Sequence, residues 1–427
     1  MKQITVAIAG CGSRGKDCYA KSQHKIPEQM KIVAIADIDP AKVEEVKNEY
    51  NVSPDMCFNS AEEMLKQPKL ADVMFICTMD RQHYSHAMAA LDLGYDLLLE
   101  KPISPELTEC KEIAEKANKL GRKVVVCHVL RYTPFYQSLK AQIESGKIGD
   151  VVAIQAMEQV GYWHQAHSFV RGNWRNTAET SPMILQKACH DMDILTWLAG
   201  SDCKSLSSIG GLKEFRADRA PEGATDRCVD CPHKDTCPYS AVKYYVGKVE
   251  RGETGWPANI VLPNATPETM AEALKTSPYG RCVYHCDNDV VDHQMVQMTM
   301  ENGVIINFVM SAFNLGGRDL RVMGTRGIIE GNMDQGWLKV GVFNGNGGLD
   351  EENINIFELA DDFSGHGGGD IRLVKDLLEI VAGEKNQGAA LTSIDKSVES
   401  HFMSMAAEAS RLAGGTLIDM KEFAANI

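Results

Sequence analysis

Short apolar runs alternate with amphipathic stretches over residues 1–130, and this alternation predicts a parallel sheet covered by helices. The expected strands are almost continuously apolar, as in strands buried on both faces, and they are 4–9, 32–36, 73–77, 97–99 and 124–127. The helices expected between them have clear signals: Pro40 opens one at 41–50, Ser60 and Glu63 form a capping box, and a third runs from Leu107 to Gly121. The first part of the chain is therefore predicted to be a doubly wound α/β unit.

From residue 151 onward the pattern changes to alternating segments joined by Gly- or Asn-rich turns, which predicts an open, mostly antiparallel sheet. The strands expected here are 151–160, 295–300, 304–310, 320–323, 337–343 and 354–359. Two helical stretches, 370–381 and 397–412, close the chain. We predict a second, α+β domain over 131–427 for substrate binding and oligomerisation, with a loop-like, cysteine-rich insertion at about 213–286.

Composition narrows the classes of partner and compartment. The 427 residues are 44% hydrophobic, enough for a sizeable core, and the net charge of −14 argues against nucleic acid or an anionic membrane as partner. The N-terminal apolar stretch is too short for a signal peptide, and no apolar run reaches the ~18 residues that span a bilayer. The 13 cysteines, several of them inside apolar segments, fit reduced thiols. We predict a cytoplasmic protein.

A nucleotide-binding fingerprint follows the first strand. Gly10-Cys11-Gly12-Ser13-Arg14-Gly15 is G-x-G-x-x-G, in which the glycines allow a tight turn, close approach of a pyrophosphate and close helix packing. Asp37 ends the second strand 22 residues after Gly15, where a carboxylate binds ribose hydroxyls and repels a 2′-phosphate. The alternatives are a glycine turn without ligand and a surface aspartate. The spacing favours a Rossmann domain that binds NAD rather than NADP.

The chain resembles the Gfo/Idh/MocA oxidoreductases, the glucose–fructose oxidoreductase and inositol dehydrogenase family. The segments that carry the resemblance are Gly10–Gly15, Asp37, Cys77-Thr78-Met79-Asp80 with His83, Glu100-Lys101-Pro102, Arg131-Tyr132, Trp174-Arg175, His190-Asp191-Met192-Asp193 and 397–412. The resemblance implies hydride transfer between NAD and a hydroxyl-bearing carbon of a sugar, cyclitol or glycoside. It also implies that Thr78, His83, Glu100, Trp174 and Arg175 lie on the cofactor side, together with the fingerprint residues.

The resemblance implies two proton-transfer groups. Lys101 would lie beside the nicotinamide and the substrate hydroxyl, and His190 would act as general acid/base or substrate ligand. An ion pair of Lys101 with Glu100 is the structural alternative. Many members carry Asp four residues before the histidine, but here that position is Gln186, followed by Lys187. Glutamine cannot accept the proton of a substrate hydroxyl, so proton transfer would fall to Lys101, His190 and Lys187.

Aromatic and hydrogen-bonding residues crowd the segment 162–175, a mixture that suits the apolar faces and polar rim of a sugar. A packed inter-domain loop is the alternative. Asp370 beside Gly367–Gly369 either contacts substrate or caps the helix 370–381. The complete set of expected substrate contacts is Lys101, Arg131, His167, Gln186, Lys187, His190, His293 and His366.

Cys228-x2-Cys231-x5-Cys237 is a metal-type spacing within the insertion, and Cys282 or Cys286 can supply a fourth thiolate. Four thiolates fit a structural zinc, which would stabilise a loop that shows no evident core. An iron–sulfur cluster, or free or disulfide-linked cysteines, are the alternatives.

The function predicted from the sequence is an NAD-dependent dehydrogenase or reductase of a small sugar-like molecule. One alternative is a redox-assisted glycoside hydrolase that oxidises the sugar only transiently. Another is a non-catalytic NAD-binding sensor. The exposed face of an open sheet also predicts a homo-oligomer.

Overall fold

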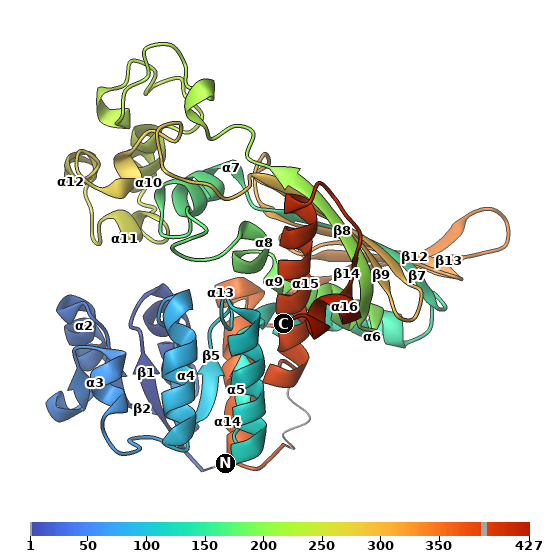
Figure 1. Cartoon of the computed structure of the whole chain (residues 1–427), viewed down its shortest axis with the longest axis horizontal. Helices are drawn as coiled ribbons and strands as arrows, with labels where there is room; N and C mark the ends of the chain where they lie inside the picture. Colours follow the sequence, from blue (N-terminus) through green and yellow to red (C-terminus); the bar gives the residue numbers. More distant parts are fainter. Residues whose placement is uncertain (1, 386–390) are drawn as a thin grey trace.

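The computed structural model describes residues 2–385 and 391–427, and these form two sheets (Figure 1). The first has six parallel strands in the order β3-β2-β1-β4-β5-β6. The second has nine, in the order β14-β13-β12-β11-β7-β10-β9-β8-β15, and is antiparallel except between β7 and β10. The predicted fold class, a parallel Rossmann sheet followed by a large and mostly antiparallel sheet, is confirmed.

All five strands expected in the first sheet are present. Its strands are β1 Ile4–Ala9, β2 Met30–Ala36, β3 Cys57–Phe58, β4 Val73–Ile76, β5 Asp96–Leu99 and β6 Val124–Val126. Its helices are α1 Ser22–Lys25, α2 Pro40–Tyr50, α3 Ala61–Leu65, α4 His83–Asp92 and α5 Leu107–Leu120. Two predicted helix boundaries are present. Ser60 caps the start of α3 by accepting a hydrogen bond from the Glu63 amide, and α5 ends at Gly121, whose φ is +62°. The cap of Ser60 is one-sided, because the Glu63 carboxylate binds Asn59 instead.

The end of the chain returns to cover the first sheet. Helix α14, Gly369–Val381, packs Leu373, Val374 and Leu377 into the apolar cluster that holds Val6 and Phe75 (Figure 1). The two predicted domains therefore share a packed helix, and the boundary near residue 130 stays a prediction from sequence.

The second sheet consists of β7 Val151–Gln159, β8 Cys203–Gly211, β9 His293–Met300, β10 Ile305–Ser311, β11 Gly317–Gly324, β12 Gly327–Asn332, β13 Trp337–Phe343, β14 Leu349–Asn355 and β15 Ile418–Asp419. Helices α6 Pro134–Glu144, α9 Cys189–Ala199, α15 Ile394–Leu412 and α16 Met420–Ala425 share its main apolar core. The predicted strand 354–359 is wrong. The strand ends at Asn355, whose side chain accepts from the Phe357 amide and starts a short helical turn.

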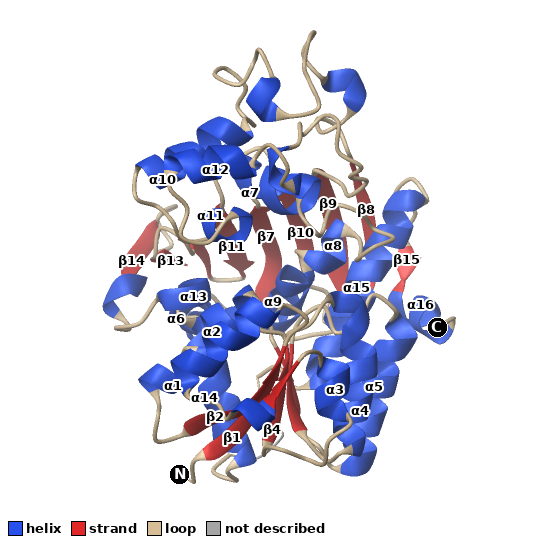
Figure 2. Cartoon of the chain, turned by 90° about the vertical axis from the view of Figure 1, so that its left-hand side faces the viewer, coloured by secondary structure: helices blue, strands red, loops and turns tan. Residues whose placement is uncertain are grey.

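The predicted insertion is loop-like over residues 213–240, apart from two short 3₁₀ turns, whereas residues 241–286 also contain short helices that the sequence did not reveal. It contains α10 Gly247–Glu250, α11 Ala258–Val261 and α12 Pro267–Ala273, which Figure 2 shows gathered beside α7, Tyr162–His164. Ala241, Tyr245, Met270 and Leu274 are fully buried in a core of its own. Helices of one or two turns are too short for periodicity to reveal. None of the described helices is long and apolar enough to cross a membrane.

Candidate active site

The glycine turn after β1 has the shape that a diphosphate needs. A side chain at Gly10, whose φ is +95°, would place its Cβ 2.5 Å from the Cys77 carbonyl oxygen, and one at Gly15 would lie 1.9 Å from the Gly10 oxygen. A Cβ at Gly12 would meet nothing within 4 Å. The helix Ser13–Ala20 begins directly afterwards. The turn is therefore packed at Gly10 and Gly15 and open at Gly12, where a pyrophosphate can approach the backbone.

Asp37 lies at the end of β2 and is anchored to this turn. Its Oδ2 accepts from the Cys11 amide at 2.7 Å, and its Oδ1 accepts from the Asp39 amide at 2.8 Å. Each carboxylate oxygen retains a lone pair, so the group can still accept from ribose hydroxyls. Ile38, after β2, is 82% exposed, and Met79, after β4, is half-exposed; β2 and β4 flank β1 in the sheet. Sequence reasoning missed these two apolar side chains, which can flank an adenine; an apolar residue directly after the strand-ending aspartate was the available signal.

Arg14 belongs to the glycine-rich fingerprint and also forms ion pairs with two carboxylates. Its Nε lies 2.6 Å from Glu100 Oε1 and its Nη2 lies 2.8 Å from Asp370 Oδ1. Although burial opposes ionisation, Arg14 holds the pKa of both carboxyls below their usual range. The cap predicted for Asp370 is wrong: the helix starts after Gly368, and the Asp370 carboxylate faces Arg14 and His366. Arg14 thus joins the first sheet to α14.

Lys101 follows β5 and reaches across to the second domain. Its Nζ donates to the Gln186 carbonyl at 2.9 Å and lies 3.5 Å from Gln186 Oε1. Gln186 Nε2 in turn donates to Asp80 Oδ2 at 3.0 Å. Asp80 is buried, and burial raises the pKa of its carboxyl. Sequence reasoning missed Asp80 as a site residue: it brings a carboxylate next to the glutamine that stands at the usual aspartate position.

The alternative ion pair between Lys101 and Glu100 does not form. Glu100 accepts from the backbone amide of Lys101 at 2.8 Å and from Arg14 and Tyr19, so its oxygens are engaged elsewhere. The Lys101 ammonium consequently faces the site.

His190 lies in the first turn of α9 beside this group. It is buried, and among the described residues its Nδ1 has no hydrogen-bond partner. The rings of His128 and His366 lie 5.6 and 6.2 Å away. Burial, followed by the charge of Lys101, lowers the pKa of His190 well below its usual value. A neutral imidazole with an unpaired nitrogen can accept a proton.

A buried ion network supports this side of the site. Lys187 Nζ lies 3.1 Å from Glu158 Oε1 on β7, and Arg318 on β11 pairs with Glu158 at 2.5 Å and with Asp191 at 2.8 Å. Lys187 is therefore partnered, as befits a positioning group. The sequence carried no signal for Glu158 or Arg318, because these contacts join strands distant in the chain.

Some expected ligands are engaged away from Lys101 and His190. Arg131 forms a two-point ion pair with buried Asp193, at 2.7 Å for both contacts, and His293 pairs with Asp292 at 2.7 Å. These partners give Arg131 and His293 structural contacts. Neither residue joins Lys101, Gln186, Asp80 and His190, which we call the Lys101 group.

On the cofactor side, His83 and Thr78 form hydrogen bonds within the protein. His83 lies 2.7 Å from the Pro102 carbonyl and 3.0 Å from the Thr78 carbonyl through its two ring nitrogens. Thr78 Oγ1 lies 3.0 Å from His86 Nδ1. They shape the loops after β4 and β5.

The aromatic segment 162–175 faces the insertion. His167 is buried, with Nδ1 2.6 Å from the Tyr245 hydroxyl, and Arg175 pairs with Asp287 at 2.8 Å. Trp174 is half-buried against Phe169. Burial, then the charge of Lys187 and more weakly that of Lys101, lowers the pKa of His164, whereas burial and the charge of Arg171 lower that of His167.

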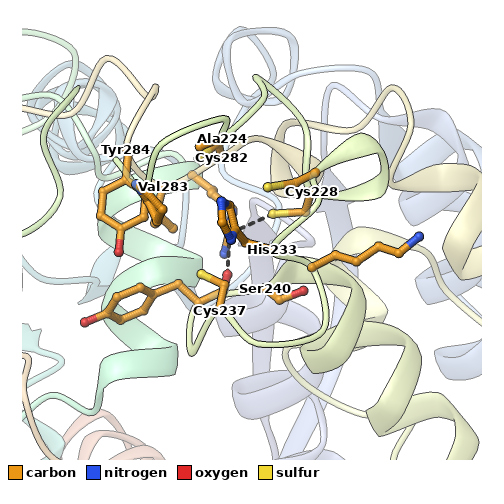
Figure 3. Close-up of a pocket in the computed structure, with 13 residues that line it drawn as sticks. Ala224, Cys228, His233, Cys237, Ser240, Cys282, Val283 and Tyr284 are labelled. Atoms are coloured by element: carbon orange, nitrogen blue, oxygen red, sulfur yellow. Dashed lines mark hydrogen bonds between the residues drawn. The ribbon is translucent and has the colours of Figure 1, made fainter. Parts of the chain in front are cut away.

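The predicted metal cysteines line one small cavity with His233, as Figure 3 shows. All the cysteines are free, so the disulfide alternative is wrong. Within residues 2–385 and 391–427 no group of three or more His, Cys, Asp or Glu side chains is placed to hold a metal ion. The zinc prediction and its iron–sulfur alternative therefore gain no support. The physical reasoning behind them also changes, because the insertion has its own apolar core and Arg171 Nη2 lies 3.6 Å from Cys228 Sγ.

Two family models match consecutive parts of the chain. The model described as "Oxidoreductase family, NAD-binding Rossmann fold" matches residues 4–128, and "Oxidoreductase family, C-terminal alpha/beta domain" matches 140–411. The protein YteT of Bacillus subtilis, named as an oxidoreductase, is 22% identical over 87% of this chain and 88% of its own length. The inositol 2-dehydrogenase of Acidothermus cellulolyticus is 24% identical, but the match spans only 51% of this chain and 59% of that protein.

Solved structures share the whole fold. An inositol dehydrogenase homolog from Azotobacter vinelandii, complexed with NAD+, has a TM-score of 0.69 at 17% identity and covers 98% of this chain and 97% of its own. An Agrobacterium radiobacter oxidoreductase in complex with NAD+, L-tartaric acid and magnesium has a TM-score of 0.68 at 15% identity, with coverage of 98% and 99%. Together with the two family models, which span most of its length, they lead to one conclusion: the chain belongs to the Gfo/Idh/MocA family of NAD-binding oxidoreductases.

Proposed function

We propose that this protein is an NAD-dependent dehydrogenase or reductase acting on a hydroxyl-bearing carbon of a sugar, cyclitol or glycoside. The observation that carries the proposal is the meeting of Lys101, Gln186–Asp80 and neutral His190 at the edge of the sheet that holds the glycine turn. The partial match to inositol 2-dehydrogenases supports a polyhydroxylated ring as substrate. NAD, when bound, supplies the hydride acceptor.

The chain's own residues then handle the substrate oxygen and its proton. Lys101 Nζ donates one N–H to the Gln186 carbonyl, and its remaining N–H groups can donate to the substrate oxygen. His190 takes the hydroxyl proton as the alcohol becomes a carbonyl, and returns it in the reverse direction. Asp80 holds the Gln186 amide in place through its 3.0 Å hydrogen bond, which fixes the direction of Lys101.

The cofactor assignments of Gly12 and Asp37 are supported by the open turn and its anchored carboxylate. Those of Thr78, His83, Glu100, Trp174 and Arg175 rest on the family resemblance.

A substrate panel tests the proposal. Purified protein is incubated with NAD and with hexoses, inositols and their glycosides, and NADH and products are followed together. NADH formed in step with an oxidised product is expected for at least one compound. Release of an aglycone without NADH would replace the proposal by redox-assisted cleavage, and binding without turnover of any compound would favour a sensor.

We also propose that the protein is a homo-oligomer formed through the open face of the second sheet. Ladder pairing places Met157, Val309, Met295 and Ile209 in one apolar row across β7, β10, β9 and β8, and Ile209 is largely exposed. Light scattering of the wild type and of Ile209→Asp measures this: a larger species that the variant dissociates is expected, and a monomeric wild type contradicts it. A cytoplasmic location without nucleic-acid or membrane partners stays a prediction from composition.

Zinc binding at the cysteine cavity stays a proposal that rests on the C-x2-C-x5-C spacing alone. Metal analysis of the full chain, with Cys231→Ser as comparison, decides it: stoichiometric zinc that the variant loses supports the proposal, and metal-free protein purified without chelator overturns it.

A further inference from the structure

One tryptophan of the insertion, Trp256, is partly exposed and packs on the aromatic segment that follows β7. Trp256 lies between α10 and α11 and is 44% exposed. Its ring nevertheless packs on three others, with centroids 5.5 Å from Trp163, 5.1 Å from His164 and 5.7 Å from His167. The ring is therefore held in place while much of its surface remains in water, an arrangement typical of a binding surface.

Trp163, on which Trp256 packs, is the middle member of a ring stack. It lies 5.4 Å from His164 and 5.8 Å from Tyr244, with planes inclined by 22° and 23°. Its Nε1 donates to the Leu315 carbonyl at 3.3 Å, which fixes the ring orientation. We call Trp256, Trp163 and Tyr244 the aromatic platform; its exposed ring is Trp256, because Trp163 stacks between His164 and Tyr244, and the Lys248 ammonium lies 5.8 Å from the Tyr244 ring centroid.

The insertion that carries two of these rings is firmly attached. His167 Nδ1 lies 2.6 Å from the Tyr245 hydroxyl, and Arg171 donates to the Tyr239 carbonyl at 2.6 Å. His167 also stacks on Tyr279 at 4.6 Å. The platform is thus preorganised, so that little conformational entropy is lost when a ligand binds.

The platform adjoins the Lys101 group. Strand β7 carries Glu158, which holds Lys187 at 3.1 Å, and the same chain reaches Trp163 and His164 five and six residues later. Lys101 donates to the carbonyl of Gln186, the residue before Lys187, and His164 packs on Trp256 with ring centroids 5.1 Å apart. A molecule held at Lys101 and His190 therefore has the platform as its neighbour on the insertion side.

The chemistry of the platform selects its occupant. Pyranose rings have apolar C–H faces that cover aromatic rings and a polar rim that stays hydrated or bonds to imidazoles. A single ring held at Lys101 would leave Trp256 in water. Resting on the proposed function, we infer that the aromatic platform binds a second pyranose ring, so that the preferred substrate is a disaccharide or longer glycoside oxidised on one terminal ring.

Paired substrates test this inference. Monosaccharides and the disaccharides that contain them are compared by steady-state kinetics with NAD, using the wild type, Trp256→Ala and Trp256→Phe. The alanine variant should raise KM for the disaccharide about tenfold, because roughly half a tryptophan surface is no longer covered, and leave the monosaccharide KM unchanged. The phenylalanine variant should recover most of the loss.

Trp337→Ala is the matched control, since Trp337 is also part-exposed, at 39%, but lies on β13. The inference is overturned if the wild type shows no preference for disaccharides, or if Trp256→Ala raises both KM values equally. Dependence on Trp256 confined to aryl glycosides would assign the platform to an aromatic aglycone and also overturn it. If no compound reduces NAD, the proposed function fails, and calorimetric titration with the same disaccharides still tests the platform: binding lost in Trp256→Ala supports it, and equal or absent binding refutes it.

Discussion

Replacing Arg14 by methionine removes the guanidinium that two buried carboxylates share. The Arg14 Nε lies 2.6 Å from Glu100 and Nη2 lies 2.8 Å from Asp370, and the two acidic side chains are only 6% and 5% exposed. Removing one partner of a buried ion pair costs about 3–5 kcal/mol, because a charge stays buried without compensation. Since Arg14 itself is 25% exposed, we expect the lower end, about 3 kcal/mol.

Thermal unfolding measures this cost. For 427 residues the unfolding entropy is about 0.9 kcal/mol/K, so a loss of about 3 kcal/mol lowers Tm by about 3 °C at neutral pH. In the wild type both carboxyls have lowered pKa values, so their stabilisation is present above the unfolded-state pKa and disappears as pH falls through the folded value. The deficit of the variant must therefore shrink in acid.

Two comparisons complete the experiment. Adding Asp370→Asn to the variant should recover part of the loss, because one unpaired charge is gone. Arg216→Met breaks an exposed pair with Asp218 and should change stability by less than about 0.5 kcal/mol. An Arg14→Met protein that melts like the wild type at neutral pH, or whose deficit is the same in acid, would refute the reasoning.

Two further predictions concern the cofactor turn and the buried histidines. Gly12→Val places its side chain in open space and should weaken NAD binding at least about 100-fold in calorimetry while Tm stays unchanged; normal NAD affinity would contradict the role of this turn. Burial lowers the pKa of His128 and of His401 to about 3, so the unfolded chain binds more protons below pH ~6.5 and stability must fall there, by about 2 kcal/mol per histidine at pH 5. Urea unfolding at pH 7 and pH 5 should show this loss, and His128→Gln should remove one histidine's share of it; equal stability at both pH values would exclude it.

The first sheet could be predicted because its information is local. Strands buried on both faces are continuously apolar, and the turn residues between them stand within a few positions of the helices they start or end. Only β3 was missed, since a strand of two residues carries no pattern.

The second domain was less predictable because its strands are only half-buried. β8 reads CKSLSSIGG, with serines and glycines that resemble a turn, and β12 contains two glycines in six residues. The segment 354–359 was apolar enough to suggest a strand, yet the Asn355 side chain ends the strand there. The short helices of the insertion depend on tertiary packing around Tyr245 and Met270.

The site residues also fall into those that local motifs reveal and those that only the tertiary structure reveals. Lys101 and His190 were found through short motifs, whereas Asp80 meets Gln186 across 106 positions and Arg14 meets Asp370 across 356. The first contact depends on how the second domain docks on the first sheet, and the second contact depends on how α14 packs against that sheet; no local pattern encodes either. Arg131 illustrates the converse, because a motif residue that looked like a ligand is engaged by Asp193.

The central claim is that Lys101 and His190 manage the proton that leaves with hydride transfer. Its most direct test is single-turnover NADH formation at saturating NAD, with the best substrate of the panel, in Lys101→Met, His190→Asn and the control His293→Asn. Each of the first two should slow the chemical step at least about 100-fold with NAD affinity retained, and the control should react as the wild type does. Wild-type rates in both Lys101→Met and His190→Asn would contradict the account.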